Sequence, residues 1–235
     1  MGMTYEQYRA RVDSAHRIVF FGGAGVSTES GIPDFRSTDG LYNTKYDEPP
    51  ETILSHEYFM TSPQKFYRFY FEKMICLSAK PNRAHYTLAE WEREGKLTAV
   101  VTQNIDGLHQ AAGSKNVFEL HGSTLDNRCM RCGKSYSRED ILRDRPSVPY
   151  CECGGMIKPN VTLYGEALPA AAVDGAIEAI RSADMLIVGG TSLSVYPAAG
   201  FVNFYRGAPE NLILINKTHI DGFKNQLNGK IGELL

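Results

Sequence analysis

The stretch IVFFGGAGVSTESGIPDFRS, residues 18 to 37, decides the fold class of this 235-residue chain. Four apolar residues at 18–21 lead directly into Gly22-Gly23-Ala24-Gly25. A buried strand that ends in a glycine turn is typical of nucleotide-binding α/β domains, where the carboxyl end of the strand faces the ligand. Ser27, Thr28 and Ser30 add hydroxyl donors to the turn. The stretch therefore predicts a ligand-binding loop at the edge of a parallel sheet.

The same strand pattern recurs along the chain. Apolar, β-rich runs occupy residues 18–21, 97–102, 117–120, 185–188 and 212–215, and helix-like segments occupy 4–15, 64–77 and 84–94. Alternating strands and helices predict a Rossmann-like, mostly parallel sheet with helices on both faces. Because the run at 185–188 is followed by Gly189-Gly190-Thr191-Ser192, we expect a second ligand-facing loop at the same edge.

The first loop lacks two common nucleotide-binding motifs. The fingerprint G-x-G-x-x-G needs a third glycine where this chain has Thr28, and no second strand ends in an acidic residue about 20 positions later. A P-loop is also absent, since no Gly-Lys-Ser/Thr follows. Backbone N–H groups and a helix N-terminus can still face a pyrophosphate. We therefore expect a nucleotide site that differs from that of a dehydrogenase.

Four of the five cysteines lie in a polar, turn-rich insert. Cys129-x-x-Cys132 and Cys151-x-Cys153 stand 18 residues apart, close to the spacing of a zinc ribbon. Four thiolates close a tetrahedron, so we expect one structural zinc. In a chain with no secretory signal, metal binding is favoured over disulfides. We place the zinc-ribbon small domain at 123–160 and the large domain at 1–122 and 161–235, with a helical and flexible insertion at about 36–80.

The composition argues against nucleic-acid and membrane partners. The formal net charge is −2 at pH 7 and the pI is near 6.3, so no overall positive field attracts nucleic acid. The sequence contains no signal peptide and no apolar run of about 20 residues. We therefore expect a cytoplasmic protein that binds neither nucleic acid nor membrane directly.

Several further motifs follow in a fixed order. They are GAGVSTESGIPDFRS (23–37), TQNIDGLHQAAG (102–113), ELHGS (119–123), the cysteine insert, IKPNVTLYGE (157–166) and GGTSLSVYPAAG (189–200). Together, over about residues 16–217, they resemble the motif series of the sirtuins, which are NAD-dependent protein deacylases. The resemblance implies a protein-lysine deacetylase that transfers the acetyl group of acetyl-lysine in proteins or peptides to ADP-ribose and releases nicotinamide.

The resemblance also implies roles for individual residues. His121 in ELHGS would be the general base on a ribose hydroxyl, which suits an imidazole that titrates near neutral pH. Asn104 and Gln103 would hold the ribose and the reacting water, while Asp106 and the Ile105 backbone would hold the nicotinamide carboxamide. The other implied NAD contacts are Gly23, Ala24, Gly25, Thr28, Asp34, Phe35, Arg36, Gly190, Thr191, Ser192, Asn216 and Ile220.

A final segment resembles the one that pairs with the substrate peptide as an added strand. Its implied contacts are Val161, Leu163, Tyr164, Gly165 and Glu166. Sirtuins that prefer succinyl or malonyl groups carry a Tyr-x-x-Arg pair, because a buried carboxylate needs a cationic partner. In FYRFYFEKM (66–74) Tyr67 is followed three residues later by Tyr70, and Tyr70 by Lys73. The pair is absent, so acidic acyl groups are disfavoured.

Two other functions share some of these features. A mono-ADP-ribosyltransferase would also cleave NAD but would pass ADP-ribose to a protein side chain. A non-catalytic NAD-sensing or interaction module would have no need of His121, Asn104 and Asp106 together, so the combination argues against it.

Overall fold

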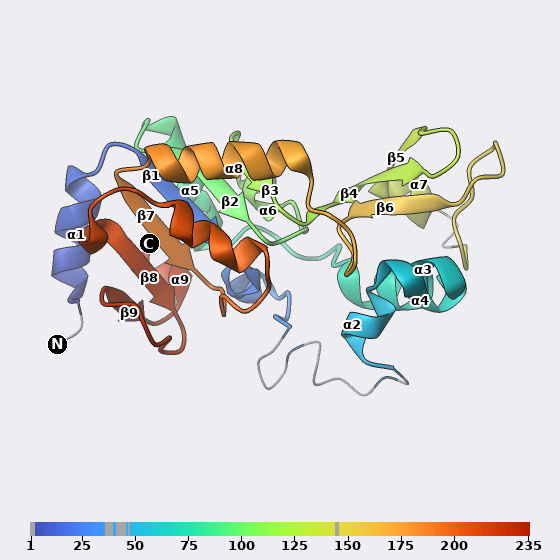
Figure 1. Ribbon diagram of the computed structural model, residues 1–235, viewed down its shortest axis with the longest axis horizontal. Helices are drawn as coiled ribbons and strands as arrows, with labels where there is room; N and C mark the ends of the chain where they lie inside the picture. The colour runs from blue at the N-terminus through green and yellow to red at the C-terminus, as the bar shows by residue number, and fades with distance from the viewer. Residues whose placement is uncertain (1–2, 36–39, 41–45, 47, 144–145) are drawn as a thin grey trace.

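The computed structural model describes residues 3–35, 40, 46, 48–143 and 146–235. Its large sheet has the strand order β3-β2-β1-β7-β8-β9, and all neighbouring strands are parallel (Figure 1). The strands are β1 (Ile18–Gly22), β2 (Leu97–Thr102), β3 (Val117–Glu119), β7 (Met185–Gly189), β8 (Leu212–Asn216) and β9 (Gln226–Asn228). The predicted Rossmann-like sheet is confirmed, and its central pair, β1 and β7, ends in the two glycine loops.

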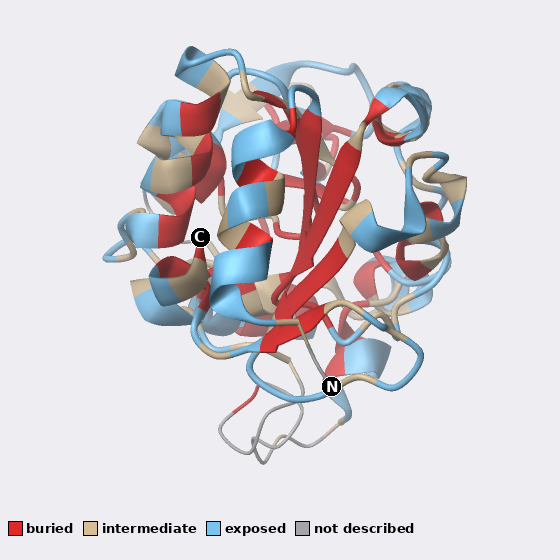
Figure 2. Ribbon diagram, turned by 90° about the vertical axis from the view of Figure 1, so that its left-hand side faces the viewer, coloured by how far each residue is buried: buried red, intermediate tan, exposed pale blue. Residues whose placement is uncertain are grey.

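Helices cover both faces of this sheet. On one face α1 (Tyr5–Ser14), α5 (Arg83–Arg93) and α9 (Ile231–Leu234) contribute to a core that contains Phe20. On the other face α8 (Ala170–Ser182) and the 3-10 helix η5 (Ala198–Phe204) pack over Phe21. Successive strand side chains point to opposite faces, so an all-apolar strand such as β1 serves both cores. Figure 2 shows the buried strands between helices whose outer surfaces are exposed.

Helix α5 shows how local sequence sets one of these elements. The Asn82 side chain accepts a hydrogen bond from Ala84 N at 2.9 Å, which caps the first turn. Ala84, Leu88 and Trp91 then recur at helical spacing and are buried against the sheet. Cap and apolar stripe together explain why the predicted helix at 84–94 forms.

The smaller part of the molecule is a three-stranded antiparallel sheet with the order β5-β4-β6. It comprises β4 (Gly122–Cys129), β5 (Ser135–Ser137) and β6 (Ile157–Val161), with α7 (Arg138–Leu142) beside it. Its apolar side chains share a core with the helical segment α2 (Pro50–Ile53), α3 (His56–Thr61), α4 (Pro63–Phe69) and the π-helical turn η4 (Tyr70–Met74). The Tyr67 hydroxyl donates to the Ile157 carbonyl across this core. The helical insertion therefore packs against the cysteine-bearing strands (Figure 1).

Some elements differ from the sequence-based expectation. The helix expected at 64–77 ends its α-helical part at Phe69 and continues as a π-helical turn. Helix α8 and strand β9 were not predicted, and α6 (Leu108–Ala112), η1 (Ala24–Val26), η2 (Thr28–Ser30) and η6 (Pro209–Asn211) are short. In the part of the chain that the structure describes, no helix is long and apolar enough to cross a membrane.

Candidate active site

The two glycine loops meet at the carboxyl ends of β1 and β7. Gly23 N donates to Gly189 O at 3.1 Å, and Gly25 N donates to Gly190 O at 2.8 Å. A Cβ on Gly23 would lie 2.7 Å from the Thr191 Cβ, and one on Gly25 would lie 2.8 Å from Gly190 Cα. These glycines are required because the loops touch. The sequence predicted that this loop offers N–H groups to a pyrophosphate, but those of Gly23 and Gly25 are directed to the neighbouring loop instead.

A chain of hydrogen bonds links the first loop to the end of β2. Ser27 Oγ donates to Asp106 Oδ2 at 2.7 Å and accepts from Asn104 Nδ2 at 3.0 Å. The other carboxylate oxygen of Asp106 accepts from Leu108 N at 2.9 Å. Ser27 is fully buried. It is thus a central residue of the site, although the sequence suggested it only as an additional donor in the loop.

Gln103 connects the end of β2 to the second loop. Its Oε1 accepts from Thr191 Oγ1 at 2.8 Å, and Asn216 Nδ2 donates to the Thr191 carbonyl at 3.3 Å. Predicted site residues from β2, β7 and β8 are therefore joined to one another at one edge of the sheet, as expected for strands that end side by side.

His121 lies between β3 and β4, where the chain passes from the large sheet to the small one. Its Nδ1 is 2.8 Å from the Gln103 carbonyl oxygen. A carbonyl only accepts, so Nδ1 carries the proton and Nε2 keeps its lone pair. Burial lowers the pKa of His121 below its usual value, although the hydrogen bond to Gln103 opposes this effect. The imidazole is therefore neutral at neutral pH.

Gly122 fixes the direction in which the chain leaves His121. Its φ is +72°, and a Cβ there would lie 1.9 Å from the Asn160 carbonyl oxygen. Thr162 N donates to the His121 carbonyl at 2.9 Å from the other strand. The histidine is thus held from both sides by backbone contacts.

Two further histidines lie behind Asp106. The His85 and His109 rings are 4.7 Å apart, and both side chains are buried. Burial lowers the pKa of His85 to about 4 despite the nearby Asp106 charge, and burial together with His85 lowers the pKa of His109 to about 3. Both rings are neutral packing groups at neutral pH.

The remaining predicted NAD contacts are distributed around this edge. Thr28 Oγ1 donates to Gly25 O at 2.9 Å, and Phe35 packs against the core of the small domain. Ser192 Oγ is 2.6 Å from Ser194 Oγ, and Ile220 N donates to Gln226 Oε1 at 3.2 Å. Ala24 begins η1, and Asp34 and Ile105 are half-buried. Arg36 lies outside the described residues.

The predicted substrate segment contacts the helical insertion. Tyr164 N donates to Leu54 O at 3.0 Å, and His56 N donates to Tyr164 O at 2.9 Å. Val161 and Leu163 are buried in the small-domain core, whereas Tyr164 and Gly165 are exposed.

Glu166 anchors this segment. Its carboxylate lies 2.8 Å from His56 Nδ1 and 3.0 Å from Lys158 Nζ, and it accepts from Leu163 N at 2.9 Å. Burial alone would raise the pKa of Glu166, but the hydrogen bonds from Leu163, His56 and Lys158 outweigh it and the pKa falls. Its contacts within the protein therefore position the loop, and the sequence did not reveal these partners.

The four predicted metal ligands converge. The sulfur atoms of Cys129, Cys132, Cys151 and Cys153 all lie within 4.8 Å of one another. The pair Cys129 and Cys153 is 3.5 Å apart, and Cys132 and Cys151 are 3.6 Å apart. Zinc–sulfur bonds of about 2.3 Å place tetrahedral ligands about 3.8 Å apart, whereas a disulfide needs about 2.05 Å. The sulfur positions therefore fit a zinc ion and not two disulfides.

Comparisons with known proteins point to one family. The Sir2 family model matches residues 23–197. A protein from Clostridium acetobutylicum named NAD-dependent protein deacetylase is 57% identical over 210 residues, which cover 88% of this chain and 85% of that protein. A protein of the same name from Clostridium perfringens is 53% identical over 231 residues, 95% of this chain and 93% of its own.

Solved structures agree with these relatives. A structure described as "Sir2 bound to acetylated peptide" has a TM-score of 0.86 and 37% identity, and covers 98% of this chain and 95% of that chain. Another, "Sir2-p53 peptide-NAD+", has a TM-score of 0.86 and 38% identity with the same coverage.

Proposed function

This chain belongs to the Sir2 family and is an NAD-dependent protein deacetylase, and from this premise we propose how its residues perform the reaction. Its substrates are acetyl-lysine-containing proteins or peptides, and NAD is the co-substrate. The reaction transfers the acetyl group to ADP-ribose and releases nicotinamide. One structural zinc is held by the four cysteines.

His121 is the general base of the proposed mechanism. The observation that carries this assignment is its Nδ1 contact with the Gln103 carbonyl at 2.8 Å, which leaves Nε2 with a lone pair. Because burial lowers its pKa, the ring is unprotonated and available to accept a ribose hydroxyl proton at neutral pH. The carbonyl of Gln103 also fixes the ring's orientation, as a general base requires.

Asn104 and Asp106 orient the ribose and nicotinamide ends of NAD. Ser27 supports both side chains through hydrogen bonds of 3.0 and 2.7 Å, so the amide oxygen of Asn104 has a fixed direction. We assign Asn104 and Gln103 to the ribose and the reacting water, and Asp106 with the Ile105 backbone to the carboxamide.

The glycine loops form the floor of the proposed NAD site. Gly23, Gly25 and Gly190 provide the close approach of the loops, while Ala24, Thr28, Thr191, Ser192 and Asn216 face the phosphates and the adenosine. Phe35 screens the reactive ribose carbon, with Asp34 and Arg36 beside it and Ile220 near the adenine. These assignments rest on the family motifs and on the position of the loops at the carboxyl edge of the sheet.

The domain division is part of the same proposal. Residues 1–122 and 161–235 form the NAD-binding domain, and 123–160 form the zinc ribbon. The insertion at about 36–80 contributes its helices to the core of the zinc-bearing domain, since the side chains of both segments form one apolar cluster. Zinc thereby stabilises the wall against which the substrate segment lies.

The substrate segment at 161–166 is assigned to the peptide and the acyl-lysine chain. Val161, Leu163, Tyr164 and Gly165 contact the substrate, and Glu166 holds the loop in place. Neutral acyl groups are favoured, because the Arg68 side chain is 81% exposed and ion-paired with Glu72 at 3.4 Å and so offers no buried cation.

A cytoplasmic location is proposed for the enzyme. Four cysteines that bind zinc must stay reduced, which is the normal state of thiols in that compartment.

The test is nicotinamide release by purified protein, with and without an acetyl-lysine peptide, followed by mass spectrometry of the peptide. We expect peptide-dependent release with loss of the acetyl group. His121→Ala should lose the activity, whereas His16→Ala, at an exposed histidine outside the site, should keep it. Transfer of ADP-ribose to protein with the acetyl group intact would instead indicate a mono-ADP-ribosyltransferase. NAD binding without any release would indicate a sensing module.

A further inference from the structure

A hollow of about 390 Å³ lies at the amino-terminal ends of β1 and β7, opposite to the edge that carries the site. Its walls are Arg17 just before β1, the end of α8 with the turn that follows it, and the loop that includes Arg206 and Asn211. Its size falls in the range of small-molecule sites, about 300–1,000 Å³. It is therefore large enough for a ligand and distant in the fold from the NAD loops.

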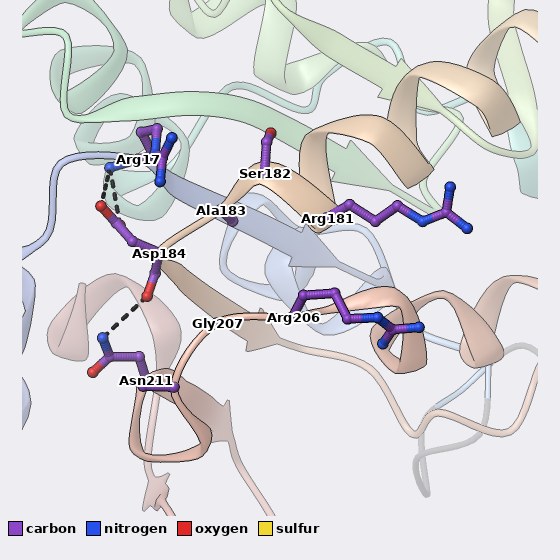
Figure 3. A pocket seen from close by; sticks show the side chains of 9 residues that line it. Arg17, Arg181, Ser182, Ala183, Asp184, Arg206, Gly207 and Asn211 are labelled. Carbon is purple, nitrogen blue, oxygen red and sulfur yellow. Dashed lines mark hydrogen bonds between the residues drawn. The ribbon is translucent and has the colours of Figure 1, made fainter.

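Hydrogen bonds fix the walls of this hollow. The Asp184 carboxylate accepts from His16 N at 3.1 Å and from Arg17 N at 3.0 Å. The Asp184 carbonyl accepts from the Tyr205 hydroxyl at 2.8 Å and from Asn211 Nδ2 at 3.0 Å. One residue thus ties β1, β7 and the 205–211 loop together (Figure 3).

The charge of the lining is positive, in a chain whose formal net charge is −2. The lining contains three arginines, Arg17, Arg181 and Arg206, and one carboxylate, that of Asp184, which already accepts from two backbone N–H groups. A hollow lined by one sign of charge concentrates ions of the opposite sign. The lining therefore favours an anion.

Among the described residues, the guanidinium groups of these arginines keep N–H donors that no protein acceptor uses. Within the described part of the chain, the guanidinium groups of Arg17 and Arg181 make no ion pair or hydrogen bond; Arg181 instead lies over the Phe204 ring at 5.2 Å. Arg206 uses only one terminal nitrogen, which donates to Asn203 O at 2.8 Å and Tyr205 O at 3.0 Å. Figure 3 shows Arg181 and Arg206 extending in the same direction, with Arg17 at the other end of the hollow.

The arginines around the hollow could have a purely structural explanation, in which a basic side chain interacts with the unpaired carbonyl groups at the end of α8. That explanation accounts for Arg181, which lies in the last turn of the helix. It does not account for Arg17 and Arg206, which come from other segments and line the same hollow.

We propose that this hollow is a second ligand site, separate from the NAD site, that binds a small molecule of the phosphate or diphosphate class. Guanidinium groups form paired, charge-assisted hydrogen bonds with phosphate oxygens. Arg181 and Arg206 bind the anion, and Arg17 adds positive charge. The site lies at the starts of the two strands whose ends form the glycine loops.

The experiment is isothermal titration calorimetry with pyrophosphate and, in a parallel arm, ADP, into protein saturated with NAD in the absence of peptide. Saturation blocks phosphate binding at the NAD loops. The test variant is Arg181→Gln/Arg206→Gln. The matched control is Arg68→Gln/Arg93→Gln, which removes the same charge from two exposed arginines that pair with the nearby glutamates Glu72 and Glu90.

We expect the dissociation constant to rise at least about tenfold in the test variant, as the loss of a charge-assisted hydrogen bond implies, and to stay within about twofold in the control. Pyrophosphate binding alone indicates an inorganic anion, and tighter ADP binding indicates a nucleotide; both support the site. Equal effects of the two variants, or no binding of pyrophosphate and ADP in the presence of NAD, would overturn it. Nicotinamide release by both variants checks that they are folded and is independent of the outcome.

Discussion

Replacing Gly122 by alanine tests how the backbone holds His121. Gly122 has φ of +72°, and its added Cβ would lie 1.9 Å from the Asn160 carbonyl oxygen. Gly95 offers a matched control, because its φ is +76° and a Cβ there meets nothing within 4 Å. Any difference between the two alanine variants therefore measures the contact with Asn160, since both carry the cost of a positive φ.

The magnitude follows from these two geometries. A non-glycine residue in the left-handed region costs about 1–2 kcal/mol, so Gly95→Ala should destabilise by about that amount. At Gly122 the collision is with backbone, and β6 must move away from β4. This movement adds repacking around Val161, about 1–3 kcal/mol, and weakens the Thr162 N to His121 O hydrogen bond, about 1 kcal/mol. We expect about 3–6 kcal/mol in total.

The assay is urea unfolding of both variants at one pH, with nicotinamide release measured on the folded protein. Gly122→Ala should lose most activity, because moving β6 away from β4 removes the Thr162 N contact that holds the His121 backbone, while Gly95→Ala should keep it. Equal destabilisation by the two substitutions, or full activity of Gly122→Ala, would refute the claim that this close approach positions the histidine.

Three further predictions concern pH, zinc and acyl choice. Burial lowers the pKa of His85 to about 4 and that of His109 to about 3, so on acidification these histidines are protonated in the unfolded chain before they are protonated in the folded protein. Their contribution to the free energy of unfolding is therefore complete above about pH 6.5. As the pH drops toward 4, the free energy of unfolding falls by up to about 1.4 kcal/mol per pH unit for each histidine. Urea unfolding at pH 7 and pH 5 should show a smaller fall for His109→Gln than for wild type, and an identical fall contradicts the reasoning. Cys132→Ser should lose the zinc and destabilise the small domain, whereas Cys76→Ser should retain one zinc per chain by atomic emission; full zinc in the first variant would rule out the four-sulfur site. Succinyl-lysine peptide should react at least about tenfold more slowly than acetyl-lysine peptide, because the Arg68 side chain is exposed and ion-paired with Glu72 and so does not offset the carboxylate; mass spectrometry of both peptides checks this, and equal rates would disprove it.

The local sequence pattern was sufficient to predict a strand or a metal site wherever the residue types within one segment indicate it. The apolar runs predicted five of the six large-sheet strands, and the cysteine spacing predicted the metal cluster. Both succeed because strand burial and metal coordination restrict the residue types at short spacing. Strand β9 was missed because Gln226–Asn228 is too short and polar for that signal.

The sequence by itself thus determined the fold class and the four-cysteine cluster, and the family motifs supplied the proposal that His121 is the general base. Only the tertiary structure decided which distant groups touch: the loops of β1 and β7, Ser27 with Asp106, His56 with Glu166, and the helical insertion with the zinc-bearing strands. It also brought three separate arginines to one hollow. These contacts join segments tens to more than a hundred residues apart, so they depend on strand order and chain reversal, which no local spacing records.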